Sequence, residues 1–511
     1  MLTTLIRREL LDNLMTFRFA AAVLIMLLLV VANTFVLIKD YERRLEAYNT
    51  VLKTQHRQSQ ELKTYSGGRL HVARPPNPLS IFNVGLDKRL GNEIWISHGF
   101  VPTLWDTGTY KLTNPLLNLF TSIDIVFIFE VVLSLIALIF AYDAIAGERE
   151  RGTLRLVLTH PVRRGQILLA KYISAMLCLL VPLLMSLLLA VILLTTSTFI
   201  SLSIGDFLRI GGMILTSIVY LSVFYLIGML ISAVTRRTGT ALMLAMFVWG
   251  FWVLVYPNAV LAAIAPPQTS QPRMASAYEE IKQMWEEFDR ERKQFLANDA
   301  FPGEDPHFGM VGADPNFNQI WGSGYHYEYF HRDSSTLRYD YHAVSNIEEL
   351  SEASKPQIPL AQDYHRFLGP QIINTAERAW LVRKQALETI FVQPAIVDRI
   401  LLRGSPVGMY DAATQAWAGT DLRGLRDFFQ AARRHRRTLI DYYYDKDAFG
   451  SQQWFSADKG AVDWDSLPQF SFQRVDVATN AKRALPDVSI LVMLNIILFV
   501  IIFLIFIKSE V

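Results

Sequence analysis

Six stretches of the chain stay apolar over the length that a bilayer requires. They cover residues 19–38, 121–143, 168–196, 209–234, 240–264 and 488–507. A hydrocarbon layer about 30 Å thick is crossed by roughly 20 helical residues, because each residue advances a helix by about 1.5 Å. Helices buried in soluble proteins seldom remain uncharged over such a length. The pattern therefore predicts an all-α membrane protein with six transmembrane helices.

Basic residues in the short connecting segments predict the orientation of these helices. Arginines precede the first stretch and recur in residues 144–167, whereas residues 197–208 contain no lysine or arginine. Because lysine and arginine are enriched in cytoplasmic loops, we expect both chain termini to be cytoplasmic. A cleaved signal peptide is the alternative for residues 19–38, but their length and the lack of a small-x-small exit favour a retained helix.

Two long insertions, residues 39–120 and 265–487, then lie on the extracytoplasmic side. Apolar side chains from Pro272 to Ala297 recur every three or four residues, which predicts a helix with one buried face. A further helix is predicted from about residue 360 to 402. Ser405-Pro406 has the character of an N-cap followed by proline at the first helical position, and Thr420 and Asp421 predict another helix start. We therefore expect the extracytoplasmic domain to be mainly helical.

Composition narrows the possible functions. The net charge is only +2, which gives no reason to expect a nucleic acid as a partner. Cys178 is the sole cysteine and lies within an apolar stretch, so an intramolecular disulfide and a cysteine-based zinc site are both excluded.

The segment 144–167 carries the most informative motif. It reads Glu148-Arg149-Glu150-Arg151-Gly152-Thr153-Leu154 and continues to Pro161. Charged positions followed by apolar ones predict a short amphipathic helix at the cytoplasmic membrane surface, suited to docking a soluble partner. The alternative is a topological anchor, whose basic residues only hold the orientation.

This motif, together with Pro161-Val162, resembles the intracellular coupling segment of ABC-2-class permeases of ABC transporters. Residues 78–91 and 416–422 resemble a subgroup with large extracytoplasmic domains, which includes gliding-motility-type permeases. The resemblance implies a fold like that of type V ABC exporters, in the bacterial cytoplasmic (inner) membrane. It also implies a pair of ABC ATPase subunits and a second permease, either an identical chain or a paralogue. Residues 1–18 resemble the amphipathic connecting helix of this class.

The expected function is that of a permease subunit of an ATP-driven exporter, coupled to a separate ATPase through residues 144–167. The sequence has no Gly-x-x-x-x-Gly-Lys-Ser/Thr loop, so we expect ATP to bind to the partner subunit and this chain to carry no cofactor and no enzyme activity. The alternative is a mechanotransmitting subunit that acts on envelope partners without moving cargo. Glu148→Arg combined with Glu150→Arg is expected to abolish transport without preventing membrane insertion.

Two polar residues within the predicted helices are further candidates. Glu130 lies near the middle of the second stretch, where a carboxylate costs roughly 3 kcal/mol unless it is protonated or paired. It is interpreted either as part of a cargo path or dimer interface, or as a structural hydrogen-bonding group for a neighbour such as Asn495 or Ser222. Finally, the histidines and tyrosines of residues 325–342 are interpreted as a metal site, a cargo contact or an aromatic loop. The sequence does not predict the transported substrate.

Overall fold

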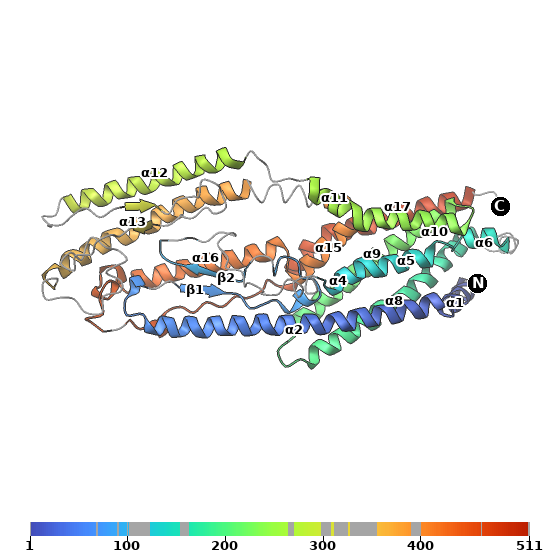
Figure 1. Cartoon of the computed structure of the whole chain (residues 1–511), viewed down its shortest axis with the longest axis horizontal. Helices are drawn as coiled ribbons and strands as arrows, with labels where there is room; N and C mark the ends of the chain where they lie inside the picture. The colour runs from blue at the N-terminus through green and yellow to red at the C-terminus, as the bar shows by residue number, and fades with distance from the viewer. Residues whose placement is uncertain are drawn as a thin grey trace.

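The computed structural model is elongated, with a helical bundle at one end and a second domain, made of helices and short strands, at the other (Figure 1). It describes residues 2–67, 70–88, 91–99, 101, 123–153, 163–263, 270–297, 308–310, 325–327, 355–389, 400–460 and 462–508. Both chain termini lie at the outer end of the bundle (Figure 1). We call the domain at the opposite end the distal domain.

Six helices among the described residues are long and apolar enough to cross a membrane. These helices are Phe17–Arg57, Ile125–Glu150, Arg164–Thr196, Ile204–Val234, Thr238–Val260 and Val477–Lys508. A helix satisfies its own backbone hydrogen bonds, which is why apolar segments of this length become helical in a bilayer. The prediction of an all-α membrane protein with six transmembrane helices is confirmed.

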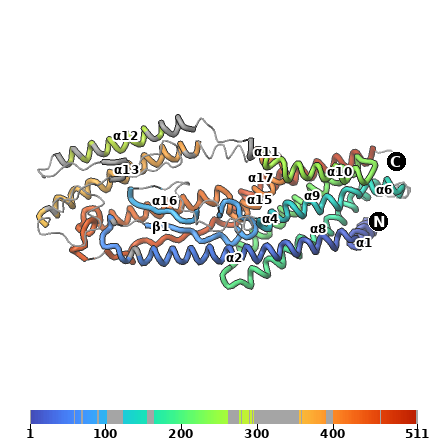
Figure 2. Tube along the Cα trace, viewed as in Figure 1, coloured from blue at the N-terminus to red at the C-terminus, as the bar shows by residue number. Residues whose placement is uncertain are grey.

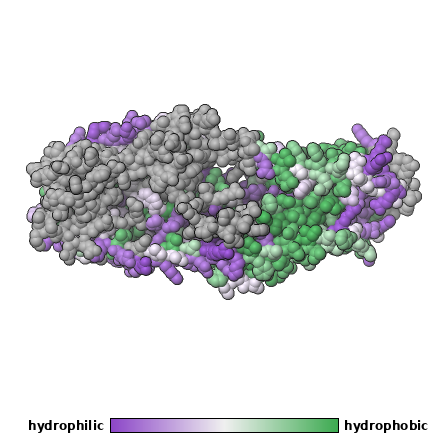
Figure 3. All heavy atoms as spheres, in the orientation of Figure 1, coloured by the Kyte–Doolittle hydropathy of each residue, from purple (hydrophilic) through white to green (hydrophobic). Residues whose placement is uncertain are grey.

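These helices form one apolar belt. Figure 3 shows it as a band of hydrophobic side chains, with hydrophilic side chains at the end that carries the termini and beside the distal domain. We call the first boundary the near edge and the second the far edge. The connection 197–203, between α8 (Arg164–Thr196) and α9 (Ile204–Val234), lies at the far edge. Within the belt, Gly228 permits close packing, because a Cβ there would meet the Cβ of Ala141 at 2.6 Å.

Two of the helices extend well beyond the belt. Helix α2 (Phe17–Glu61) is a single helix of 45 residues, about 67 Å long. Figure 2 shows it as an unbroken rod that runs from the near edge along the distal domain. Its second part lies within residues 39–120, which the sequence assigns to the first insertion. Helix α17 (Val477–Lys508) likewise begins before the predicted boundary at residue 488.

The distal domain packs helices around a second apolar core. Its main elements are strands β1 (Leu70–Ala73) and β2 (Glu93–Ile96) and helices α12 (Ser270–Ala297), α13 (Ile358–Leu387) and α16 (Leu422–Asp445). The strands are antiparallel, with Leu70 opposite Ile96. Trp285, Phe288 and Ile281 of α12 are buried, as the predicted apolar face requires. A second strand pair, β3 (Phe308–Met310) and β4 (Tyr325–Tyr327), lies in segments that the sequence did not predict as strands.

Helix α15 (Pro406–Ala418) belongs to the bundle, although the sequence places it within the extracytoplasmic insertion. Its side chains Val407, Met409 and Tyr410 are buried in the same apolar core as the membrane helices, and it packs against α9 and α17. The Ser405 side chain caps its start, Pro406 occupies its first turn, and Gly419 ends it in the left-handed conformation at φ +71°. The predicted helix start is confirmed, and its depth in the bundle is a finding of the structure.

Candidate functional site

The predicted coupling motif begins on α6 (Ala146–Glu150), a short helix at the near edge that forms the end of the second membrane span. The Glu148 carboxylate accepts a hydrogen bond from the Lys171 ammonium of α8 at 2.6 Å. The same ammonium donates to Glu9 of α1 (Leu2–Leu14) at 3.0 Å. Lys171 is only 8% exposed, and a buried ammonium without a carboxylate would be strongly destabilising. Glu148 therefore ties α6 to α8 and, through Lys171, to α1.

Arg149 and Glu150 bind the end of α9 and the start of α10. The Arg149 guanidinium donates to the carbonyl oxygens of Ala233 at 3.3 Å and Thr235 at 2.9 Å, where α9 ends. The Glu150 carboxylate accepts from the backbone amide of Thr238 at 3.0 Å and from its hydroxyl at 2.7 Å, where α10 (Thr238–Trp249) begins. These contacts satisfy helix-end groups and place a cation at a C-terminus and an anion at an N-terminus, as the helix dipoles favour.

The start of α6 is fixed by a side chain that the sequence analysis did not single out. The Ser232 hydroxyl accepts hydrogen bonds from the backbone amides of Ile145 at 3.0 Å and Ala146 at 2.9 Å. Ser232 is fully buried near the end of α9. With Lys171, it holds the motif in place. A polar residue within an apolar run was the available signal for both, because a buried polar group needs a partner.

The motif turns outward after Glu150. Arg151, Gly152 and Thr153 are exposed. Gly152 has φ +73°, a backbone conformation that favours glycine. Leu154 and Pro161 lie outside the described residues. The predicted site thus has two sides: Glu148, Arg149 and Glu150 bind within the chain, and Arg151 to Thr153 face outward.

Further charged side chains at the near edge join α2 to the second membrane helix and α8 to α17. Arg18 of α2 pairs with Asp143 at 2.9 Å and donates to the Tyr142 hydroxyl at 2.8 Å. Arg164, at the start of α8, donates to the carbonyl of Ile507 at 2.7 Å, close to the end of α17. Several helices that are distant in sequence are therefore joined at this edge by charged side chains.

Glu130 lies in a π-helical turn, Phe129–Leu133, within the second membrane helix. Its backbone carbonyl accepts hydrogen bonds from the Tyr220 hydroxyl at 2.9 Å and from Ser134 at 2.5 Å. Such turns are frequent at functional positions because they break the regular ladder of backbone hydrogen bonds. A role for Glu130 in a cargo path or an interface stays a prediction.

Asn495 has a clear structural environment. Its side-chain amide donates to the carbonyls of Val219 at 3.0 Å and Leu491 at 2.9 Å, and its oxygen accepts from the Ser222 hydroxyl. Ser222 in turn shares a hydrogen bond of 2.6 Å with Tyr172. Asn495 therefore joins α17 to α9 and α8. The structure pairs Asn495 with Ser222, the two groups proposed as partners for Glu130.

Helix α15 contributes residues that the sequence analysis missed. The ring of Tyr410 stacks on that of Tyr220, with centroids 4.2 Å apart, and its hydroxyl shares a hydrogen bond of 2.8 Å with Ser217. Both partners belong to α9, and Tyr220 is also the residue that contacts Glu130. No local signal predicted this contact, because the sequence of α15 is that of an ordinary helix within the insertion.

Residues 328–342 of the predicted histidine and tyrosine cluster lie outside the described residues, and the part of the chain that is described holds no metal-binding group of histidine, cysteine and acidic residues.

Comparison with known proteins places this arrangement in a family. The family model described as "ABC-2 family transporter protein" matches residues 3–296, and a domain of unknown function matches residues 376–473. A probable ABC transporter permease protein NosY of Pseudomonas aeruginosa is 38% identical over 138 residues, 26% of this chain and 49% of that protein. The protein of the same name from Stutzerimonas stutzeri is 37% identical over 133 residues, 25% and 47% of the two chains. The chain thus spans about half the length of these relatives.

Proposed function

The chain belongs to the ABC-2 family of transporter proteins, and from that premise we propose that it is the permease subunit of an ATP-driven exporter. In this proposal a separate pair of ABC ATPase subunits hydrolyses ATP. They act on the near edge, which faces the cytoplasm of a bacterial cell, through residues 144–167. A second permease, identical or similar, completes the membrane unit.

The observation that carries the proposal is the two-sided construction of α6. The side chains of Glu148, Arg149 and Glu150 bind α8, α9, α10 and, through Lys171, α1. The outer continuation of α6, Arg151 to Thr153, is exposed. A force applied to the exposed residues therefore reaches α8, α9 and α1 through partly buried hydrogen bonds, and α10 through the exposed contacts of Glu150. A topological anchor would need the basic residues but not these contacts.

Accessibility labelling tests the assignment directly. Cys178 is buried and is the sole cysteine, so Cys178→Ser gives a background for single-cysteine variants. Thr153→Cys is expected to react with a membrane-impermeant maleimide only in inverted vesicles, and to be protected when the ATPase is bound. Thr198→Cys at the far edge, where Thr198 is exposed, is the matched control and is expected to react only in intact cells. Labelling of Thr153→Cys from the outside of intact cells would refute the proposal.

A charge reversal on the exposed side separates coupling from folding. Glu148→Arg with Glu150→Arg breaks the contacts to α8, α10 and, through Lys171, α1, so a loss of transport in that variant does not distinguish lost coupling from disturbed folding. Arg151→Glu changes an exposed side chain whose hydrogen bond in the structure is to the carbonyl of Gly147, within its own turn, at 3.0 Å. We expect this variant to lose transport and ATPase binding while its thermal stability stays close to that of the wild type. Full transport by a stably inserted Arg151→Glu variant, with the ATPase still bound, would contradict coupling through this surface.

A mechanotransmitting role is the second candidate, and the continuity of α2 favours it. One helix runs from the near edge to the distal domain, so a tilt of its membrane part displaces its distal part (Figure 1). In that case the distal domain acts on an envelope partner and no cargo passes through the membrane. Stimulation of ATPase activity by cargo in reconstituted vesicles would support export. Crosslinking of the distal domain to an envelope protein, without cargo stimulation, would support mechanotransmission.

A further inference from the structure

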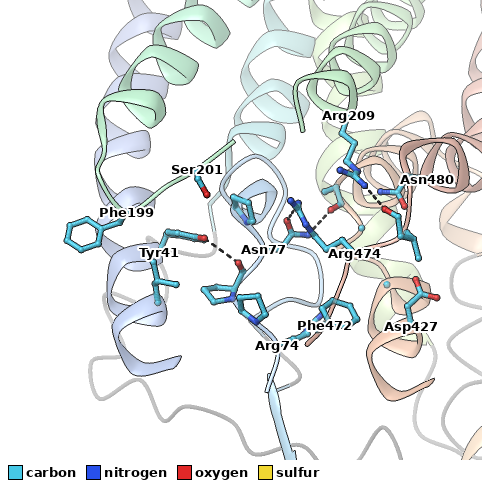
Figure 4. A pocket seen from close by; sticks show the side chains of 18 residues that line it. Tyr41, Arg74, Asn77, Phe199, Ser201, Arg209, Asp427, Phe472, Arg474 and Asn480 are labelled. Atoms are coloured by element: carbon cyan, nitrogen blue, oxygen red, sulfur yellow. Dashed lines mark hydrogen bonds between the residues drawn. The ribbon is translucent and has the colours of Figure 1, made fainter. Parts of the chain in front are cut away.

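A pocket of about 330 Å³ opens at the far edge, between the membrane helices and the distal domain. Figure 4 shows its wall, to which α2 contributes Tyr41, the 197–203 connection contributes Phe199 and Ser201, and the segment before α17 contributes Arg474. The volume is within the range of sites that hold small molecules or headgroups. None of the residues discussed for the near edge lines this pocket.

One carboxylate on this side of the pocket is shared by two guanidinium groups. Asp206, which is 1% exposed, pairs with Arg474 at 2.8 Å and with Arg209 at 3.3 Å. Arg474 also donates to the side-chain oxygen of Asn77 at 3.1 Å. Arg209 and Arg474 both line the pocket, and Arg474, whose side chain is 33% exposed against 7% for Arg209, is the more accessible of the two. Two cations facing one carboxylate leave a positive charge without an anionic partner in this cluster.

A second cluster, joined to the first through Asn77, whose backbone amide donates to Asp87 at 3.4 Å, repeats this imbalance. Arg74 lines the pocket and shares Asp87 with Arg44, at 3.2 and 2.9 Å, while Arg44 and Lys88 share Asp40, at 3.0 and 2.7 Å. Three cations therefore face two carboxylates. Burial lowers the pKa of Arg74, and repulsion from Arg44 lowers it further while Asp87 opposes both effects.

The remaining acidic residue on the wall does not offset this charge. Asp427 is held by both nitrogens of Arg483, at 2.7 and 3.0 Å, as a neutral pair. Across the two clusters, five cations face three carboxylates. The pocket is therefore lined by an electropositive surface suited to an anion.

Asn480 adds a second polar feature to the wall. Its side chain is almost completely buried, and its amide nitrogen donates to the carbonyl of Trp417 at 3.1 Å. Its amide oxygen has no hydrogen-bond partner among the described residues. Because a buried acceptor normally has a partner, a ligand with a hydroxyl donor fits this position.

The position of the pocket at the edge of the apolar belt indicates which kind of anion it binds. Phe199 on its rim is 46% exposed, and Ile204 at the start of α9 is 84% exposed. Exposed apolar side chains beside a cationic pocket, at the end of two membrane helices, lie where acyl chains meet headgroups in a bilayer. A soluble anion would gain nothing from these apolar neighbours, whereas a lipid would contact both kinds of surface.

We propose that this pocket binds the phosphate headgroup of an anionic phospholipid that carries a headgroup hydroxyl, with Arg474 pairing with the phosphate. Asn480 accepts the hydrogen bond of the hydroxyl, and the acyl chains leave past Phe199 along α8 and α9. Phosphatidylglycerol has this chemistry. The ligand of this site is a component of the bilayer, so lipid binding can be tested independently of whether the protein exports any cargo.

The full-length protein in nanodiscs of equal parts phosphatidylglycerol and phosphatidylcholine tests the site. After gentle detergent extraction, native mass spectrometry counts the lipids that stay bound. We expect the wild type to retain phosphatidylglycerol preferentially, and Arg474→Gln to lower its occupancy about tenfold, the effect of losing one charge-assisted hydrogen bond. Arg378→Gln removes an exposed arginine of α13 and is the matched control, with no change expected.

Ser201→Trp gives an independent test if Arg474→Gln disturbs folding. Ser201 lines the pocket and is exposed, so a large ring there narrows the entrance without touching either charge cluster. It too is expected to lower phosphatidylglycerol occupancy. Equal retention of the two lipids by the wild type would overturn the proposal, as would unchanged occupancy in the Ser201→Trp variant. Displacement of the lipid by free glycerol 3-phosphate would overturn the lipid assignment in favour of a soluble phosphate.

Discussion

The two edges of the apolar belt each hold a cluster of three charged side chains, and the two clusters have opposite imbalance. At the near edge, one ammonium, Lys171, lies between the carboxylates of Glu9 and Glu148. At the far edge, one carboxylate, Asp206, lies between the guanidinium groups of Arg209 and Arg474. In both clusters the shared central group is the most buried member.

This difference separates two roles that a buried charge can have. The central ion holds helices together, and removing it leaves two like charges facing each other in a poorly hydrated site. The outermost ion of each cluster is partly exposed and carries the charge that the chain itself does not balance. The near edge is therefore electronegative in this cluster and the far edge electropositive, which suits different partners on the two sides of one membrane.

Removing the central cation of the near edge is expected to have the largest effect. Lys171→Met leaves Glu9 and Glu148 without a cation, and the breaking of such a buried pair costs about 3–5 kcal/mol. Thermal unfolding of the detergent-purified protein measures this loss. Lys39→Met, at an exposed lysine paired with Glu42, is the control and should change little. Equal stability of the two variants would show that the near-edge cluster does not brace the bundle.

Removing the central anion of the far edge is expected to cost somewhat less. Asp206→Asn leaves Arg209 and Arg474 facing each other, but Arg474 is partly exposed and is able to turn toward solvent. We expect a loss of about 2–4 kcal/mol in the same unfolding measurement. Asp363→Asn, at an exposed aspartate of α13, is the control. A larger loss for Asp206→Asn than for Lys171→Met would contradict the ranking of the two edges.

Acidification is expected to lower the stability of the distal domain, independently of the charged clusters at the two edges. Burial lowers the pKa of His365 from 6.5 to about 3, so the folded protein keeps this imidazole neutral at pH 5. The unfolded chain takes up the proton below pH 6.5, so the stability that His365 contributes falls as the pH falls. The loss between pH 7 and pH 5 is about 2 kcal/mol, at 1.4 kcal/mol per pH unit below 6.5.

Hydrogen exchange of α13 as a function of pH measures this effect in the distal domain. His365→Gln removes the titrating group and is expected to flatten the pH dependence between pH 7 and pH 5. The same slope in the wild type and in this variant would assign the dependence to other groups.

The smallest effect is expected from a helix-end contact of the near edge. Arg149→Gln removes the cation that donates to the carbonyls at the end of α9, which we expect to cost about 1 kcal/mol. Arg151→Gln, two residues further along, is the matched control, because Arg151 is exposed and its hydrogen bond lies within its own turn. Unfolding of both variants under identical conditions would decide the matter, and a larger loss for Arg151→Gln would contradict the two-sided construction of α6.

Local patterns were sufficient to predict the elements. Apolar runs of bilayer length gave the six membrane helices, because a chain in hydrocarbon satisfies its backbone most simply as a helix. Ser405 was identified as an N-cap and Thr420 with Asp421 as a helix start, because short polar side chains reach backbone amides of the first turn, and in the structure Ser405 and Asp421 cap these helices. The apolar face of α12 was visible at helical spacing, and Trp285 is buried on it.

The partners of the charged motif required the tertiary structure. Glu148 and Lys171 belong to different helices, as do Arg149 and Thr235, and no spacing in the sequence indicates which ends of the membrane helices meet. A run of charged residues is equally consistent with side chains that face solvent and with side chains that form ion pairs and hydrogen bonds within the chain. The depth of α15 in the bundle was hidden for the same reason.

The sequence by itself thus determined which segments cross the membrane, where several helices begin, and that Glu130 and Asn495 are polar groups among apolar ones. The fold alone decided that Asn495 bonds Ser222, that Tyr410 stacks on Tyr220, and that each edge of the belt shares one central ion between two opposite charges. The physical reason is range. Helix formation and capping depend on neighbours within one or two turns, whereas the pairing of buried charges depends on which distant segments the packing of the whole chain brings within about 3 Å.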